Sequence, residues 1–340
     1  MVWTDLFNVE TIMIPLIDCS SIAVGAFEDV CDENFENVAS DIGAAMTKTG
    51  MCNLINHGID MKKIAKVYEA SKAFFNLPAE TKAKYKKVDV RKSFNGYVGP
   101  GDELVNAKQK NSTELRESWD TWSVDGHDEK NFPNDEVPDF KLAINAIRSE
   151  LENMARKVLR CIEIYLQLDD GALLSAHENL QDHSIESQTI LRSLYYFNLD
   201  PNESIPPDAI RCGEHSDWGT ITLLIQDMVG GLEVKTLDGE WLDATPVENA
   251  ILLNSGQLLE YWTGGRFYAA MHRVRINNQA MGKVPRQSFV HIVNADRGTQ
   301  VFPFPTTPVL MDKVEQFEKF NNEPADAYDY FQRLIEASYY

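Results

Sequence analysis

Apolar residues recur at helical spacing in three segments of the first half of the chain. In the first, residues 34–49, apolar positions lie three or four apart and Gly50 follows as a stop signal. The same spacing predicts helices over residues 61–75 and 139–167. Two strands are predicted from short apolar runs, at Ile14–Ile17 and Met51–Asn56.

The pattern changes between residues 188 and 294, where short β-rich runs alternate with turn residues such as Gly230-Gly231 and Asp238-Gly239. Six strands are predicted there: Thr189–Phe197, Thr220–Ile225, Leu232–Lys235, Ala250–Asn254, Tyr268–Ile276 and Gln287–Val293. Many short strands with regular turns are typical of a barrel or a two-sheet jelly roll. Further helices are predicted at 312–320 and 325–338, so we expect a mainly β fold with flanking helices.

We expect one integrated unit with three parts: a helical and β region over 1–185, a β core over 186–300 and a helical tail over 301–340. Hydrophobic residues make up 44% of the 340, enough for a large buried core. The formal net charge of −20 disfavours nucleic acid and anionic membranes as partners. It leaves room for local arginines that bind an anionic small molecule.

The N-terminal sequence has no basic segment before a long apolar run, and no stretch approaches the ~18 apolar residues of a membrane helix. The five cysteines are scattered and form no C-x-x-C pair, which favours free thiols in a reducing compartment. These features predict a cytoplasmic protein. They leave its oligomeric state open.

The strongest candidate for chemistry is His215-Ser216-Asp217. In an extended segment residues i and i+2 point the same way, so both side chains can reach one ion. His272, within a β-like run, would add a second imidazole. Two imidazoles and one carboxylate are typical of Fe(II) oxygenases, in which three coordination positions stay open. A lone H-x-D pair is a weak signal, however, and a buried structural role is the commoner interpretation of a single histidine.

A third motif, Arg286-Gln287-Ser288, places a guanidinium and a hydroxyl on one face of a strand. Arginine is suited to bidentate binding of a carboxylate, and the hydroxyl adds a hydrogen bond. A metal beside this pair matches a 2-oxo acid, whose keto acid end would chelate the metal while its far carboxylate meets Arg286.

Several longer stretches resemble one enzyme family nearly end to end. They are GMCNLINHGI (50–59), FFNLP (74–78), ESWD (117–120), HSDWGTITLLIQD (215–227) with GGLEV after it, and NSGQLLEYWTGGRFYAAMHRV (254–274). The chain is similar in these to the isopenicillin N synthase-type family of Fe(II)/2-oxoglutarate dioxygenases.

The resemblance implies a double-stranded β-helix, a form of jelly roll, with Fe(II), 2-oxoglutarate and O2 as cofactor and cosubstrates. It implies that His215, Asp217 and His272 bind iron. It also implies that Arg286 and Ser288 bind the C5 carboxylate of 2-oxoglutarate and that Tyr196 hydrogen-bonds this cosubstrate. Leu194 and Phe197 depart from the Asn and Pro that flank this tyrosine in many members of the family.

The substrate is expected to be a small, carboxylated or amino-acid-derived specialised metabolite. Hydroxylation, desaturation or oxidative cyclisation, as in the ring closure of kainoid synthases, would all begin at an unactivated C–H bond. The candidates for substrate contact are aromatic and basic: Trp119, Trp218, Arg192, Arg211, Arg266 and Arg275. Each of the arginines could equally be structural.

Two alternatives remain at this point. One is an Fe(II) oxidase of the same fold that uses no 2-oxoglutarate, in which Arg286 and Ser288 would bind the substrate. The other is a non-catalytic jelly-roll binding module, which needs no aligned metal ligands. Stoichiometric release of succinate would exclude the oxidase. The binding module predicts a metal-free chain that still binds its partner, and the intact set of His215, Asp217 and His272 counts against it.

Overall fold

The computed structural model describes residues 13–87, 95–103, 114, 116–122, 132–181, 187–198, 210–314, 326–329 and 331–332. Its α-helices are α1 (Asp32–Lys48), α2 (Met61–Phe75), α3 (Ala79–Ala83), α4 (Phe140–Leu166), α5 (Gln257–Trp262) and α6 (Gln279–Gly282). Short 3-10 segments are η1 (Ser20–Ile22), η2 (Phe27–Asp29) and η5 (Leu174–Gln181). The strands are β1 (Leu16–Asp18), β2 (Met51–Ile55), β3 (Gly96–Val98), β4 (Glu117–Thr121), β5 (Ile190–Tyr196), β6 (Ile210–His215), β7 (Ile221–Gln226), β8 (Leu232–Lys235), β9 (Trp241–Asp243), β10 (Ile251–Ser255), β11 (His272–Arg275) and β12 (Arg286–Val293).

The ends of the longer helices follow ordinary capping chemistry. The side chain of Asp60 caps α2 by accepting a hydrogen bond from the Lys62 amide at 2.8 Å. Helix α1 has Asp32 in its first turn and Lys48 in its last, which complements the helix dipole. The chain then turns sharply at Gly50, whose φ of +68° is disfavoured for residues with a side chain.

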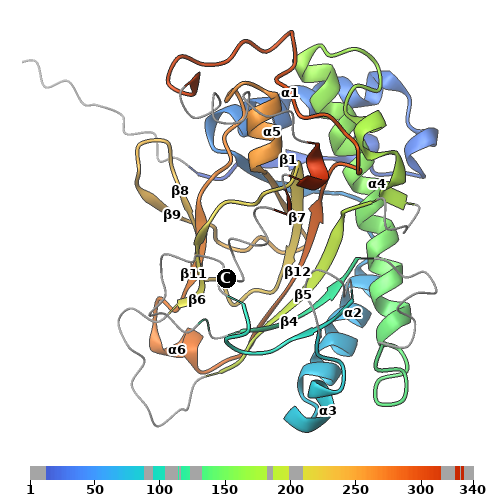
Figure 1. Ribbon diagram of the computed structural model, residues 1–340, viewed down its shortest axis with the longest axis vertical. Helices are drawn as coiled ribbons and strands as arrows, with labels where there is room; N and C mark the ends of the chain where they lie inside the picture. Colours follow the sequence, from blue (N-terminus) through green and yellow to red (C-terminus); the bar gives the residue numbers. More distant parts are fainter. Residues whose placement is uncertain are drawn as a thin grey trace, which may run out of the picture.

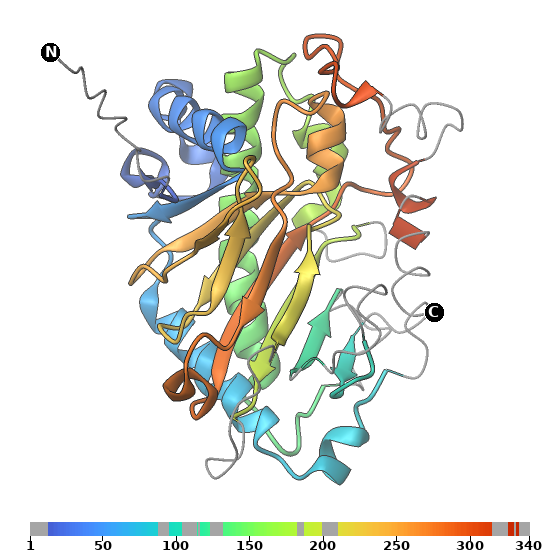
Figure 2. The same cartoon turned by 90° about the vertical axis from the view of Figure 1, so that its left-hand side faces the viewer.

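The strands form two sheets that face each other. The larger, eight-stranded sheet has the order β1-β2-β10-β7-β12-β5-β4-β3, and the smaller has the order β6-β11-β8-β9. All pairs except β1 with β2 are antiparallel. In Figure 1 the β6 and β11 strands lie on one side of the large sheet and helices α2 and α4 lie on the other. The turned view shows α4 running behind the strands of the large sheet (Figure 2).

Side-chain alternation along the strands divides the interior into two cores. Along β7, Ile221, Leu223 and Ile225 pack into the core shared with the helices. Leu224, between them, faces the small sheet and joins the second core. The period of two in an extended strand explains this division. The large sheet therefore has one face against the helices and one face against the cavity described below.

The mainly β architecture with flanking helices is confirmed, and the helices expected over 34–49, 61–75 and 139–167 are α1, α2 and α4 within a few residues. Several elements were not predicted: β3, β4, β6, β9 and helices α3, α5 and α6. Strand β6 carries Arg, Gly and Glu in place of alternating apolar residues, so its sequence has no strand pattern. It is extended because it pairs with β11. The strand expected over Tyr268–Ile276 is limited to β11.

The helices expected at 312–320 and 325–338 fall largely outside the described residues. Of the described residues in the second range, 327–329 and 331–332 are helical. No helix within the described ranges is long and apolar enough to cross a membrane.

Candidate active site

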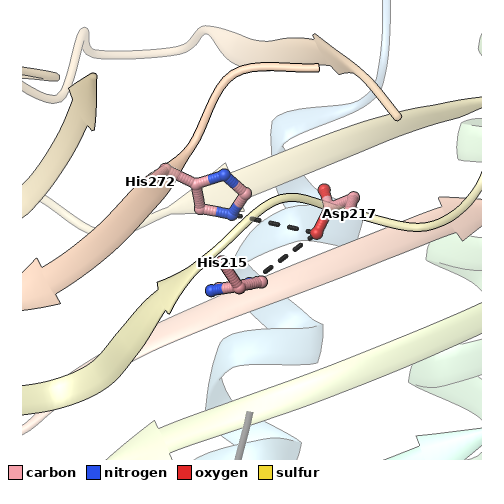
Figure 3. Close-up of side chains that lie close together, drawn as sticks. All are labelled: His215, Asp217 and His272. Carbon is pink, nitrogen blue, oxygen red and sulfur yellow. Dashed lines mark ion pairs between the residues drawn. The ribbon is translucent and has the colours of Figure 1, made fainter. Parts of the chain in front are cut away.

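Three side chains from neighbouring strands meet at one end of the small sheet. His215 ends β6 and His272 begins β11, and the two residues are paired across these strands. Asp217 follows two residues after His215. The Nε2 atoms of both histidines lie 3.8 Å from Oδ1 of Asp217, and the three possible ligand atoms are all within 4.8 Å of one another. Figure 3 shows both imidazoles directed at the carboxylate. The structure thus brings together the three residues singled out from sequence.

Backbone hydrogen bonds fix the orientation of both imidazoles. Nδ1 of His215 lies 2.8 Å from the Gly213 carbonyl and Nδ1 of His272 lies 3.1 Å from the Ala270 carbonyl. Because a carbonyl only accepts, each Nδ1 carries the proton and each Nε2 keeps its lone pair. A backbone carbonyl that accepts from Nδ1 is the usual partner of a metal-binding histidine.

The carboxylate is anchored just as firmly. Oδ2 of Asp217 accepts a hydrogen bond from Asn254 Nδ2 at 2.8 Å, which leaves Oδ1 facing the histidines. Its backbone carbonyl accepts from the Gln257 amide, also at 2.8 Å. The turn after Asp217 packs against the segment of Gly256, where an added Cβ would lie 2.1 Å from the carbonyl oxygen of Gly219. Glycine at 256 is therefore required for this close approach.

The charge states suit a divalent cation. Burial raises the pKa of Asp217, but the nearby His272 and His215 and the hydrogen bonds outweigh burial, so the pKa is lowered overall. Burial, reinforced by His215, lowers the pKa of His272 to about 4. At neutral pH Asp217 is thus ionised and His272 is neutral, as metal binding requires. Two imidazoles and one carboxylate are a donor set that fits Fe(II).

Arg286 and Ser288 lie on β12, and both are almost completely buried. The Arg286 guanidinium donates to Gln226 Oε1 at 2.9 Å and to Ser288 Oγ at 3.3 Å. Its Cζ lies 5.0 Å from the ring centre of Tyr196, the residue opposite it on β5. Within the described ranges no acidic side chain pairs with Arg286, and its Nε has no hydrogen-bond partner. A buried cation without a counter-ion is suited to bind an anionic ligand.

One cavity between the sheets joins all of these groups. It is lined by His215, Asp217, His272, Arg286, Ser288 and Tyr196. Two of the residues expected to contact a substrate, Trp218 and Arg192, line it as well. The metal-ligating group and the unpaired guanidinium can therefore act on one molecule.

Trp119 does not line this cavity, which corrects the expectation from sequence. Strand β4 pairs with β5 so that Trp119 lies opposite Ser193 and Asp120 lies opposite Arg192. This register turns Asp120 toward the cavity and Trp119 toward the helices, where it is fully buried between Phe74 and Phe140. A shift of one residue in a strand reverses which face a side chain occupies.

Arg211, Arg266 and Arg275 also do not line the cavity. A bulge in β6 brings Cys212 and His215 to the cavity side, and Arg211 instead donates to the carbonyls of Met281 and Val284 at 3.0 and 2.7 Å. Arg266 stacks over Tyr165 of α4 with its Cζ 5.0 Å from the ring centre. The substrate-contact role expected for these three arginines is therefore not supported by their positions.

Because Trp119 packs in the core and not in the cavity, its replacement should affect the stability of the protein but not its binding of metal. Replacing Trp119 by phenylalanine should lower the free energy of unfolding by about 1–3 kcal/mol, because a fully buried indole is replaced by a smaller ring that leaves a gap in the core. The affinity for Fe(II) should stay unchanged. Urea unfolding and metal titration measure the two quantities, and weakened metal binding at full stability would contradict the assignment.

Sequence reasoning missed a group of charged residues on the cavity wall. Lys87, Glu103, Arg116 and Asp120 line it beside Arg192. The only sequence signal for them is Asp120, which stands next to Trp119 in the ESWD stretch. Phe331, from the C-terminal segment, also lines the cavity and was not predicted.

Comparison with known families matches both parts of the chain. Residues 14–139 match the family described as non-haem dioxygenase in morphine synthesis N-terminal. Residues 186–294 match the 2OG-Fe(II) oxygenase superfamily. The second match contains His215, Asp217, His272, Arg286 and Ser288.

Individual relatives agree with these matches. A 2-oxoglutarate-dependent dioxygenase of Dothideomycetidae sp. is 30% identical over 253 residues, covering 70% of this chain and 73% of the relative. A Neurospora crassa protein solved with alpha-KG and thymine is 27% identical, with a TM-score of 0.79 over 97% of this chain and 98% of its own. A 2OG-Fe(II) oxygenase family protein from Caulobacter crescentus is 26% identical, with a TM-score of 0.75 over 95% and 98% of the two chains.

Proposed function

Because the chain belongs to the 2OG-Fe(II) oxygenase superfamily, we propose that it oxidises an unactivated C–H bond of a small, carboxylated or amino-acid-derived metabolite. The enzyme uses Fe(II), 2-oxoglutarate and O2. For hydroxylation, one oxygen atom enters the substrate as a hydroxyl group and the other enters succinate as 2-oxoglutarate loses CO2. Desaturation and cyclisation consume the same cosubstrates, and hydroxylation is the outcome proposed here.

The observation that carries this proposal is the shared cavity. In it the ligand atoms of His215, Asp217 and His272 lie within 4.8 Å of one another, beside the buried Arg286. The first three side chains would hold Fe(II), and Arg286 with Ser288 would hold the far carboxylate of 2-oxoglutarate. Tyr196, whose ring lies against Arg286, would border the same cosubstrate.

The residues around the cavity contribute positioning and exclusion of water. When bound, Fe(II) together with 2-oxoglutarate would activate O2, which is the oxidant for the C–H bond. The hydrogen bonds at each histidine Nδ1 and at Asp217 Oδ2 keep the ligand atoms aimed at one point. Leu194, Leu232 and other buried apolar side chains line the cavity and limit access of water to the reacting centre.

Two relatives support an amino-acid-like substrate. A 1-aminocyclopropane-1-carboxylate oxidase of Dictyostelium discoideum is 27% identical over 302 residues, covering 78% of this chain and 77% of the relative. A homoarginine-6-hydroxylase of Glycine max is 26% identical over 322 residues, covering 90% and 92% of the two chains. Both names refer to amino acids with a free carboxylate, and both proteins match most of this chain.

An anaerobic titration of the Fe(II)-loaded protein with 2-oxoglutarate tests the proposal directly. We expect a weak visible charge-transfer band from the chelate. Replacing Arg286 by alanine should weaken 2-oxoglutarate binding by about tenfold or more, since a buried charge-assisted contact is lost. Arg266→Ala, outside the cavity, is the matched control. An unchanged titration in Arg286→Ala would overturn the carboxylate assignment. In a separate assay with O2, substrate oxidation without succinate release would favour the oxidase alternative.

A further inference from the structure

Two buried arginines lie in one region at the start of strand β12. Arg286 is the first residue of this strand and is 1% exposed. Arg211, on strand β6, is 0% exposed, and its NH2 group donates to the carbonyl of Val284 at 2.7 Å. Val284 stands only two residues before Arg286 in the chain. Arg211 thus holds the segment from which Arg286 enters the cavity, although Arg211 does not line the cavity itself.

Neither guanidinium pairs with an acidic side chain in the part of the chain that the structure describes. Arg286 donates to neutral oxygens, those of Gln226 at 2.9 Å and Ser288 at 3.3 Å. Arg211 donates to backbone carbonyls alone, and its Nε and NH1 have no hydrogen-bond partner. The acceptors around both arginines therefore orient the guanidinium groups without neutralising their charge.

The acidic residue beside this region makes its hydrogen bonds to the backbone. Asp227 follows Gln226 in the chain, at the end of strand β7. Its Oδ1 accepts from the Val229 amide at 3.0 Å and its Oδ2 from the Gln287 amide at 2.6 Å. Its carboxylate is thereby fixed to the turn after β7 and to β12. The residue that does contact the Arg286 guanidinium is the uncharged Gln226.

Two like charges are therefore buried in one region. Burial and the nearby charge of Arg286 lower the pKa of Arg211 to about 10, while Tyr196 and Asp227 act in the opposite direction. Arg211 thus stays protonated at neutral pH. A buried cation without a counter-ion is costly, and a second one beside it adds repulsion. Such an arrangement favours the binding of an anion, because the anion supplies the missing counter-charge.

We propose that Gln226 and Arg211 determine the preference of this site for a 2-oxo acid that has a second carboxylate. Gln226 orients the Arg286 guanidinium with a neutral oxygen, so its charge stays available to the ligand. Arg211 adds a second positive charge without touching the ligand. Both are positioning residues that act through Arg286. This inference rests on the proposed function, in which Arg286 binds the far carboxylate of 2-oxoglutarate.

Two substitutions of Gln226 separate its neutrality from its hydrogen bond. Gln226→Glu keeps an acceptor and adds a negative charge, whereas Gln226→Met removes the acceptor and stays neutral. We expect Gln226→Glu to weaken 2-oxoglutarate binding by about tenfold or more, because the new carboxylate pairs with Arg286 and repels the ligand. Gln226→Met should weaken it less. A residue that only orients Arg286 predicts the opposite order, because a carboxylate is the stronger acceptor.

The measurement is an anaerobic titration of the Fe(II)-loaded protein, followed by the visible band of the chelate. One probe is 2-oxoglutarate. The other is 2-oxopentanoate, which has the same keto acid end and a methyl group in place of the far carboxylate. Gln226→Glu should leave the affinity for 2-oxopentanoate unchanged. Gln181→Glu is the matched control, because Gln181 also accepts from an arginine, Arg156, at 3.1 Å but is exposed and outside the cavity.

Two variants of Arg211 test the second charge. Arg211→Gln should weaken binding of 2-oxoglutarate several-fold, and Arg211→Lys should restore most of it because the charge is kept. Urea unfolding without 2-oxoglutarate checks the fold. Gln226→Glu should be at least as stable as the wild-type protein, since it gives Arg286 a counter-ion. If Arg211→Gln does not fold, the two Gln226 variants carry the test by themselves.

Three results would overturn the proposal: wild-type affinity for 2-oxoglutarate in Gln226→Glu, weaker binding by Gln226→Met than by Gln226→Glu, or an equal loss for 2-oxoglutarate and 2-oxopentanoate. Wild-type affinity in a folded Arg211→Gln would overturn the part assigned to Arg211. Arg286→Ala separates these results from failure of the proposed function. If Arg286→Ala weakens 2-oxoglutarate binding and Gln226→Glu does not, only the role of Gln226 is lost. If the wild-type protein forms no chelate band, the oxygenase function itself is contradicted.

Discussion

Replacing His272 by alanine should lower turnover by roughly a thousandfold or more. Loss of a residue that only hydrogen-bonds to a metal ligand costs about 10–100-fold in metal affinity or activity, and here a proposed ligand itself is removed. His272 offers its Nε2 to the same point as His215 and Asp217, 3.8 Å from the Asp217 carboxylate. With one imidazole gone, the remaining two groups hold Fe(II) weakly.

The measurement is the amount of Fe(II) retained after anaerobic loading and buffer exchange, together with succinate release. His57→Gln is a matched control: His57 is also buried, but its Nδ1 accepts from the Ile59 amide and it lies outside the metal-ligating group. Circular dichroism checks that both variants fold. Stoichiometric iron and near wild-type turnover in His272→Ala would remove this residue from the site.

Replacing Asp120 by asparagine should destabilise the protein by about 3–5 kcal/mol, the usual cost of leaving buried charges without their partner. Asp120 is 1% exposed and accepts hydrogen bonds from both Arg192 and Lys87. The matched control is Asp32→Asn, because Asp32 pairs with Arg160 but is 79% exposed. An exposed pair contributes at most ~1 kcal/mol. Equal losses of unfolding free energy in the two variants would contradict the importance assigned to the buried contacts of Asp120 with Arg192 and Lys87.

The same substitution should change the dependence of stability on pH. Burial raises the pKa of Asp120, but Arg192 and Lys87 outweigh it and hold the pKa below its ordinary value of 3.8. Because the folded-state pKa is the lower one, the unfolded chain takes up the proton first as pH falls. The stabilisation is therefore complete above about pH 5 and is lost progressively as the pH falls from there through the lower, folded-state pKa. Urea unfolding from pH 7 to pH 3 should show the stability difference between the wild-type protein and Asp120→Asn becoming smaller toward acid pH.

The spacing of residues within single strands was readable from the sequence. His215 and Asp217 stand two apart at a strand end, and Arg286 and Ser288 stand two apart on another strand. In extended chain such pairs share a face whatever the rest of the fold does, because the alternation is a local property of the backbone. The long amphipathic helices were predicted for the same local reason.

The sequence alone determined which residue types could bind a metal and a carboxylate, and the tertiary structure decided which other side chains share their cavity. The register of β4 against β5 selects Asp120 over Trp119, and the bulge in β6 turns Arg211 away. Lys87, Glu103 and Arg116 lie far from Arg192 in the chain and have the charge of ordinary surface residues. Only the pairing of strands and loops from distant segments buries them together, and such long-range pairing has no local signal in the sequence.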